Sequence, residues 1–248
     1  MAALAGLAMS PAVRAEVTAT DDAIITFNSS VFPKVLPRDG TAPVGISIEG
    51  RVRPKKNRDP AALRLIELEI HKAAKLFRAR IPQCSIAKIY PASTKRALAA
   101  CGRSRIGYGR IRAEASFPGR DRLNFDGRVL LFNGRLANGR PAILMHVFNE
   151  QPPSSYVFPF AIAKRRGEYG TVLTASTAIG RWSRITAFKL VVRKTFRHKG
   201  RQRGYFNASC PAPEGFRGGI SPVVRARLSF ADNTASVIPV FGACRVAS

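Results

Sequence analysis

The stretch Val44-Gly45-Ile46-Ser47-Ile48-Glu49-Gly50-Arg51-Val52-Arg53 decides the fold class of this chain. Its large apolar residues all fall on one parity, and its charged residues all fall on the other. Because successive side chains of a β-strand point to opposite faces, this pattern predicts a strand with one face in a core and one face in solvent. The 3.6-residue period of a helix does not fit it.

The same type of pattern recurs along the chain. Strict alternation returns at 66–71, 123–129 and 224–230, and further apolar, β-branched or aromatic runs lie at 142–149, 155–163, 170–178, 185–196 and 236–241. Together these segments predict about nine to eleven strands. Short strands at such regular spacing predict an all-β fold, an antiparallel two-sheet sandwich.

Turn-forming pairs separate the predicted strands. Asn133-Gly134 and Asn138-Gly139 each supply the positive φ angles of a tight hairpin turn. Pro152-Pro153, Lys199-Gly200 and Gly218-Gly219 mark later breaks between strands. No long low-complexity linker divides the chain, so the strands are expected to belong to one domain.

One short helix is predicted near residues 93–101. Ser93 can cap its first turn, and Ala97 to Ala100 favour helical backbone. Gly102 occupies the position that a C-terminal cap prefers.

The four cysteines indicate a disulfide framework. Cys84, Cys101, Cys210 and Cys244 allow three pairings, and the sequence alone proves none of them. Pairing Cys84 with Cys101 and Cys210 with Cys244 is the simpler proposal, because a cross pairing must close a loop of over 100 residues. A zinc site is the competing interpretation, but no C-x-x-C or C-x-x-H spacing appears.

The N-terminus predicts export. Residues 2–9 are small and apolar, and Val13 and Ala15 stand at the −3 and −1 positions of a signal-peptidase site before Glu16. The basic region that normally opens a signal peptide is missing, so a signal over 1–15 is expected to be truncated or weak, with a frayed tail as the alternative. We expect 16–29 to be a flexible segment and 30–248 to form a single β-sandwich domain.

Later stretches lack the run of about 18 apolar residues that a membrane-spanning helix requires. The mature protein is therefore expected to be secreted or to lie in the cell envelope, at its extracellular face, either soluble or peripherally attached.

The charge balance is extreme. The chain has 41 Lys and Arg against 15 Asp and Glu, which gives a formal net charge of +26 and a pI near 11.4. A positive field of this size attracts anionic cell-wall polymers, anionic membrane surfaces and nucleic acid. The alternative is that the arginines reflect a GC-rich coding bias and face solvent without a ligand.

Two basic turns are the best candidates for polyanion contacts. The first comprises Arg51, Arg53, Lys55, Lys56 and Arg58, and the second comprises Arg193, Lys194, Arg197, Lys199, Arg201 and Arg203. Lys and Arg at exposed hairpin tips can meet phosphate or carboxylate without a pocket. Phe196, Tyr205 and Phe206 lie beside the second turn and could add stacking, although the alternation directs some of them to the core.

Catalytic motifs are incomplete. Gly102-Arg103-Ser104-Arg105-Ile106 lacks the second glycine of a nucleophile elbow. Gly107-Tyr108-Gly109 begins like a dinucleotide loop but has no third glycine, so its glycines are better explained by close packing or a bulge in a strand. We therefore assign no catalytic, cofactor-binding or metal-binding residue.

One stripe of titratable residues remains. Glu67, Glu69 and His71 should project from the same face of a strand, where they could serve acid–base chemistry or hold a metal. The alternative is that they pair with arginines on neighbouring strands. His146 lies in an apolar run and is expected to be a satisfied strand residue, while Trp182 could stack on a sugar or base or belong to the core.

Several motifs carry a resemblance to a known family. They are Leu130-Leu131-Phe132-Asn133-Gly134, Ala100-Cys101-Gly102 with Ile106-Gly107-Tyr108-Gly109, and the stretch from Phe188-Lys189-Leu190 through Lys199-Gly200 to Ala208-Ser209-Cys210-Pro211. In these the chain, over roughly residues 30 to 245, resembles a family of uncharacterised exported proteins of high-GC soil bacteria. The resemblance implies a signal peptide and four shared cysteine positions, which supports the local pairing. It implies no activity, ligand or catalytic residue, and this chain is more basic than such relatives.

These observations favour a non-enzymatic secreted or envelope-associated protein that binds anionic surface polymers or lipid headgroups through its basic turns. An intracellular nucleic-acid-binding protein is the first alternative. An extracellular hydrolase with an unrecognised site is the second. No cofactor is expected, and the sequence does not fix the oligomeric state.

Overall fold

The computed structural model describes residues 16–20, 22–55, 60–116, 119, 121–177 and 183–247. The first half of the chain forms β1 (Glu16–Ala19), β2 (Ala23–Phe32), β3 (Val35–Leu36), β4 (Ala42–Pro54), β5 (Leu63–His71), β6 (Ala74–Leu76), α1 (Ile86–Ile89), α2 (Thr94–Cys101), a 3₁₀ turn (Gly102–Ser104) and β7 (Arg105–Ala115). The second half forms β8 (Leu123–Arg135), β9 (Pro141–Glu150), β10 (Pro153–Lys164), β11 (Tyr169–Ser176), β12 (Ser183–Val192), β13 (Thr195–His198), β14 (Arg201–Gly204), β15 (Phe206–Ala208), β16 (Gly218–Phe230) and β17 (Ala235–Val246).

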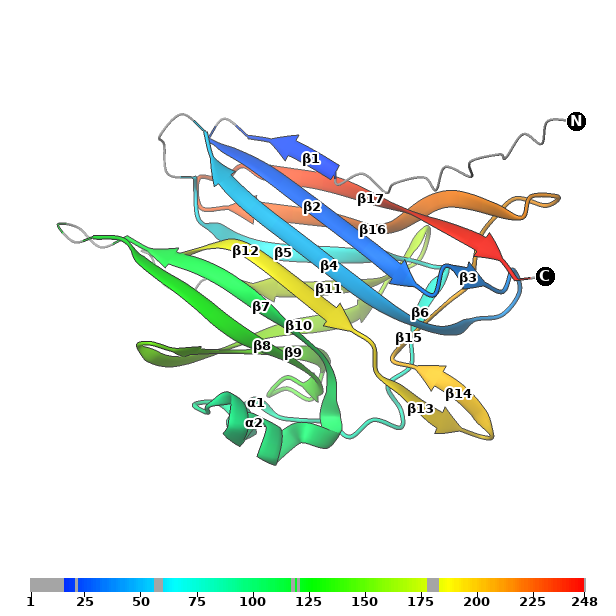
Figure 1. Cartoon of the computed structure of the whole chain (residues 1–248), viewed down its shortest axis with the longest axis horizontal. Helices are drawn as coiled ribbons and strands as arrows, with labels where there is room; N and C mark the ends of the chain where they lie inside the picture. The colour runs from blue at the N-terminus through cyan, green and yellow to red at the C-terminus, as the bar shows by residue number, and fades with distance from the viewer. Residues whose placement is uncertain are drawn as a thin grey trace, which may run out of the picture.

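The fold is mostly β, but the predicted two-sheet sandwich is wrong. Thirteen strands form one strongly curled mixed sheet, a half-barrel, in the order β1-β2-β4-β12-β7-β8-β9-β10-β11-β5-β16-β17-β3 (Figure 1). The β17–β3 pair is parallel, and the other neighbours along this path are antiparallel. Alternation predicted the strands because a curled sheet and a sandwich both bury one face of each strand, so the pattern does not distinguish them.

The two ends of this sheet come together. β17 lies against β1 and β2, while its hydrogen-bonded neighbours are β16 and β3. The N-terminal strands are therefore part of the fold: Ile25 and Phe27 of β2 are 2% exposed in the main core. The segment 16–29 forms β1 and most of β2 instead of the flexible stretch expected, because its apolar side chains complete the closure of the curl.

The concave face of the sheet holds the main hydrophobic core. Ile46, Ile66, Ile111, Phe160 and Leu228 come from strands spread around the curl, and all are buried in one cluster. The backbones of β7 and β12 approach closely, and a Cβ on Gly109 would lie 2.1 Å from the carbonyl oxygen of Lys189 on β12. The glycines of Gly107-Tyr108-Gly109 thus serve packing.

The predicted short helix is present as α2 on the outer face of β8 and β9. Ser93 caps it, because its Oγ accepts a hydrogen bond from the backbone nitrogen of Arg96 at 3.3 Å. Ala97 and Cys101 pack with Phe132 and Leu144 in a second hydrophobic cluster, outside the curl. Gly102 does not end the helix in a left-handed cap; its φ of −55° lets the chain continue into the 3₁₀ turn.

The four cysteines form two disulfides, Cys84–Cys101 and Cys210–Cys244, which are the two local pairs. The first closes the helical segment against β8, where the backbone nitrogen of Cys84 donates to the carbonyl oxygen of Asn133. The second joins the end of β17 to the segment after β15. Each bond therefore fixes a peripheral segment to the sheet.

Two of the predicted turns are strand residues. Asn133-Gly134 lies inside β8, where the Asn133 side chain donates to the carbonyl oxygen of Ile81 and accepts from Nε of Arg78. Gly218-Gly219 opens β16. Asn138-Gly139 and Lys199-Gly200 are turns as predicted, with φ of +80° at Gly139 and φ of +49° and +72° at Lys199 and Gly200.

Candidate functional site

The charges of this protein are segregated along the chain. Residues 70–113 contain eleven Lys or Arg, and residues 169–213 contain nine, and neither segment has an Asp or Glu. β12 pairs with β7, and Phe196 of β13 packs on Phe77, so these two segments meet at one end of the molecule. This end includes the helices and the β13–β14 hairpin, at the bottom of Figure 1.

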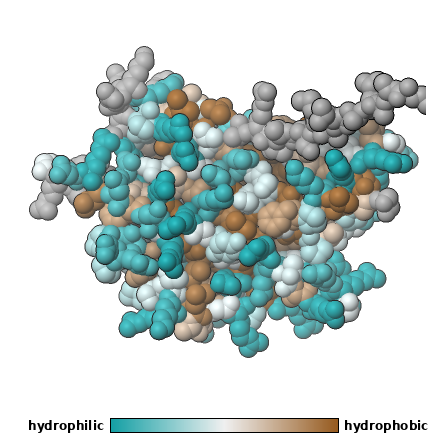
Figure 2. Space-filling view, in the orientation of Figure 1, coloured by the Kyte–Doolittle hydropathy of each residue, from teal (hydrophilic) through white to brown (hydrophobic). Residues whose placement is uncertain are grey.

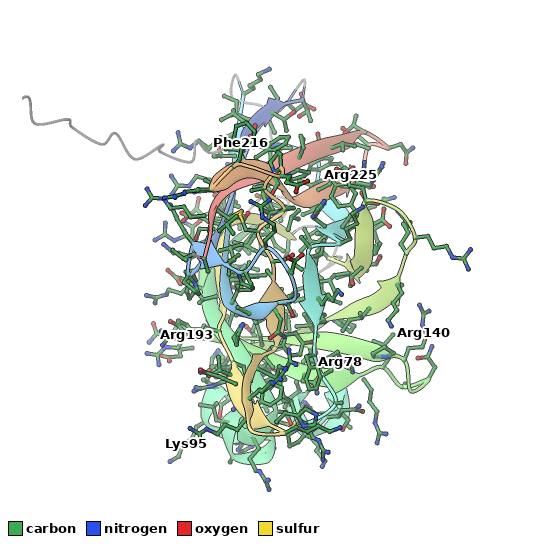
Figure 3. All side chains as sticks on the ribbon, turned by 90° about the vertical axis from the view of Figure 1, so that its right-hand side faces the viewer. Arg78, Lys95, Arg140, Arg193, Phe216 and Arg225 are labelled. Atoms are coloured by element: carbon green, nitrogen blue, oxygen red, sulfur yellow. A yellow bond between two sulfur atoms is a disulfide. The ribbon has the colours of Figure 1, made fainter. Side chains whose placement is uncertain are left out.

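We call the exposed cations of this region the basic end. Its members are Arg80, Lys88, Lys95, Arg96, Arg103, Arg105, Arg193, Lys194, Arg197, Lys199, Arg201 and Arg203, most of them exposed and Lys194 and Arg203 partly buried. Figure 3 shows Lys95 and Arg193 in the lower half of the molecule, with Arg225 and Phe216 in the upper half. Within the described part of the chain, no carboxylate forms an ion pair with a member of this set.

The hairpin at this end is held firmly. Its two strands pair through Phe196 with Arg203 and His198 with Arg201, around the tight Lys199-Gly200 turn. On one face, the rings of Phe196 and His198 lie 5.7 Å and 5.3 Å from the ring of Phe77. At its base, the backbone nitrogen of Tyr205 donates to the carbonyl oxygen of Lys194 at 2.8 Å. The cations are thus displayed on a fixed scaffold.

The pKa of His198 is affected by the positive charges around the hairpin. Desolvation against its neighbours lowers the pKa of His198, and the positive charges of Arg80, Lys199 and Arg203 lower it further. A like-charged cluster without counter-ions is unfavourable by itself, so an anion placed beside it would relieve the repulsion.

The first basic turn lies elsewhere. Arg51 pairs with Ala187 of β12, and Arg193 follows six residues after Ala187, which separates the two turns by about 20 Å along the strand. Arg51 and Arg53 line a cavity of about 560 Å³ that also contains Arg112, Glu114 and Asp126.

Carboxylates balance several cations around this cavity. Asp126 pairs with Arg110 and Arg112, and Glu114 pairs with Arg184 at 2.8 Å. Lys55 donates to the carbonyl oxygen of Thr20. Lys56 and Arg58 lie outside the described residues. The two predicted turns are therefore separate surfaces, and carboxylates lie beside the first, although none of them is paired with Arg51 or Arg53 in the described residues.

The aromatic residues beside the hairpin do not form a stacking platform. Tyr205 and Phe206 are buried in the main core, 5.4 Å apart in an edge-to-face arrangement. Phe196 faces Phe77. Phe196 lies between exposed neighbours, as alternation predicts, whereas the consecutive residues Tyr205 and Phe206 are both buried, so recognition at this end depends on charge. Trp182, the other stacking candidate, lies outside the described residues.

Within the predicted stripe of acids and histidine, Glu69 is bound by arginines. Glu69 of β5 is 0% exposed and accepts from Arg165, from Nε of Arg225 and, at 3.2 Å, from Nε of Arg227. The hydrogen bond from Arg225 is the main reason that the pKa of Glu69 is lowered. Because three guanidinium groups bind its carboxylate, Glu69 serves as an ion-pair partner and not as a free acid, base or metal ligand.

The remaining candidates are structural. Nδ1 of His71 accepts from the backbone nitrogen of Ala73, and burial lowers the pKa of His71. His146 is buried on the outer face of β9, with Nε2 2.9 Å from the carbonyl oxygen of Ala92, and burial also lowers its pKa. Ser104 is buried in the 3₁₀ turn.

Among the described residues, no three His, Cys, Asp or Glu side chains come together as a metal site, and no helix is long and apolar enough to cross a membrane.

Comparison with known proteins adds no assignment. The chain matches no protein-family model, and no curated protein or solved structure is significantly similar to it. The resemblance to exported four-cysteine proteins is thus supported only at the level of the two disulfides.

The structure adds cations that motif reasoning missed. Arg80 lies near enough to His198 for its charge to act on that ring, and Lys95, Arg96 and Arg103 belong to α2 and the 3₁₀ turn at the same end of the molecule. The signal that could have found them is the absence of any acid from residues 70–113.

Proposed function

We propose that this protein is a non-enzymatic binding protein that works outside the cytoplasm and holds anionic surface polymers or lipid headgroups through its basic end. The observation that carries the proposal is the set of exposed cations on the β13–β14 hairpin and the α2 segment, with no carboxylate paired to them in the described residues. Arg and Lys of this kind form charge-assisted hydrogen bonds with phosphate and carboxylate.

The disulfides support the location. Two disulfides are typical of proteins in an oxidising compartment and are uncommon in the cytoplasm. They disfavour the intracellular nucleic-acid-binding alternative, although the charge alone suits either polyanion. The Glu69 cluster, already filled by arginines, offers no free carboxylate for the hydrolase alternative.

The test reverses charge at matched positions. A hairpin variant carries Arg197→Glu and Arg201→Glu, and a control carries Lys164→Glu and Arg166→Glu on the exposed β10–β11 turn. Retention is measured on isolated cell walls and on vesicles of phosphatidylglycerol and phosphatidylcholine, over a series of salt concentrations.

We expect the wild-type protein and the control to be retained at low salt and released as salt rises, since counter-ion release drives such binding. The hairpin variant should bind at least tenfold more weakly, because each reversal replaces an attraction by a repulsion. Equal retention of the hairpin variant and the control would refute the proposal, as would retention that salt does not change.

A further inference from the structure

A cavity lies where the two ends of the curled sheet meet. It has a volume of about 430 Å³ and is bounded by the end of β2 on one side and by β16 and β17 on the other. The segments around β3, β6 and β15 complete its walls. We call it the seam cavity. Its lining includes no member of the basic end.

The seam cavity is mainly apolar. Val31, Leu36, Ala74, Ala208 and Val223 line it, with the disulfide-bonded Cys244. Small-molecule sites in proteins have volumes of about 300–1,000 Å³ and combine apolar walls with a few polar groups. The size and the lining of the seam cavity both fit that description.

A few polar groups on the wall can donate hydrogen bonds. Ser29 is 3% exposed, and its Oγ is buried without a hydrogen-bond partner. Nδ1 of His71 accepts from the backbone nitrogen of Ala73, so the neutral ring keeps its proton on Nε2. Lys34 adds a positive charge, and none of the described Asp or Glu residues lines the cavity.

An unsatisfied buried hydroxyl is unfavourable, and native proteins rarely leave one without a partner. A ligand oxygen would satisfy it. Together with Lys34, Ser29 therefore favours an anionic acceptor group over a cationic or purely apolar ligand.

The surface beside the cavity is also apolar. Phe32 and Val35 flank the lining residues Pro33 and Lys34 and are 40% and 53% exposed. Ile220, which pairs with the lining residue Ala243, is 70% exposed. Hydrophobic side chains appear among hydrophilic ones near the end of β17 in Figure 2. An exposed apolar rim suits the entry of a ligand with a hydrocarbon portion.

We propose that the seam cavity binds an aliphatic carboxylate, with the hydrocarbon chain against Val31, Leu36 and Val223 and the carboxylate near Lys34 and Ser29. Binding is expected to be reversible and one-to-one. β2 and β17 are in contact at the cavity without a backbone ladder between them, and β3, which follows β2, pairs with β17 beside it.

Three probes of equal chain length test the proposal by titration calorimetry: decanoate, decanol and decyltrimethylammonium, all below their aggregation concentrations. Lys34→Gln removes the charge at the cavity, and Lys164→Gln is the control on the β10–β11 side. Ala243→Phe and Ser221→Phe each fill part of the cavity from a different strand, and thermal melting checks that both remain folded.

We expect saturable one-to-one binding of decanoate to the wild-type protein. Lys34→Gln should weaken decanoate about tenfold, as the loss of a hydrogen bond to a charged group does, and leave decanol unchanged. Lys164→Gln should have no effect, and whichever cavity-filling variant folds should lose the binding. The proposal is overturned if decyltrimethylammonium binds as well as decanoate, if both filled variants bind normally, or if wild-type protein does not saturate.

Discussion

At the scale of single residues, Glu69 shows how a sequence pattern can locate a residue correctly and leave its role open. Alternation predicts that Glu69 shares a face with Glu67 and His71, but it does not show which side chains lie opposite. In the structure three arginines from two other segments converge on its carboxylate. Those arginines follow Glu69 by about 100 residues or more, so only the strand order brings them together.

Replacing Glu69 by Gln should lower the free energy of unfolding at pH 7 by about 1–3 kcal/mol, because buried hydrogen bonds to charged partners are lost. This loss is smaller than that expected for a fully buried ion pair, since the side chains of Arg165, Arg225 and Arg227 are 54%, 30% and 42% exposed and can turn to water. Urea denaturation measures the change.

The pH dependence gives a second measurement of the same cluster. The folded-state pKa of Glu69 is lowered from 4.5, so its contribution is present above about pH 4.5 and is lost as pH falls through the folded-state pKa. Glu69→Gln should therefore flatten the acid limb of the stability profile. Glu67→Gln on the same strand is the control, and an equal effect in both variants would contradict the assignment.

At the scale of elements, the sequence predicted α2 and many of the strands but misplaced two turns. Asn133-Gly134 has the composition of a turn, yet the Asn133 amide is held by Ile81 and Arg78, and these tertiary bonds keep the pair extended inside β8. A local preference for a turn is overridden when distant groups form hydrogen bonds with the same side chain in an extended conformation. The curl also depends on distant partners, since alternation within a strand does not specify its neighbours.

The disulfide of the helical segment makes a prediction at this scale. In Cys84→Ser/Cys101→Ser, the stability should fall by about 3 kcal/mol, the loop-closure value for the 17-residue separation. Because α2 packs outside the curl, proteolysis should first attack residues 85–104 while the sheet stays folded. Cys210→Ser/Cys244→Ser is the comparison and should leave residues 85–104 protected. Early cleavage of that segment in both variants would contradict the prediction that the Cys84–Cys101 disulfide protects it.

At the scale of the whole molecule, net charge alone does not show where a polyanion would bind. The sequence predicted the hairpin cations, because they are contiguous, but treated two basic turns alike. The structure separates the turns, places carboxylates near the first, and joins the second to helix cations that come from about 100 residues earlier. The proximity of the hairpin cations and the helix cations depends on the β7–β12 pairing, which no local sequence pattern predicts.

Binding through one end should be visible by hydrogen exchange. With a saturating anionic vesicle or soluble wall polymer, amides of the β13–β14 hairpin and of α2 should exchange more slowly, because contact and reduced repulsion stabilise this end. Amides around Arg51 and Arg53 should not change. The pKa of His198, measured by NMR, should rise on binding as anions offset Arg80, Lys199 and Arg203. Equal protection of the hairpin and of the amides around Arg51 and Arg53, with no change in the pKa of His198, would instead indicate a diffuse attraction to the overall charge.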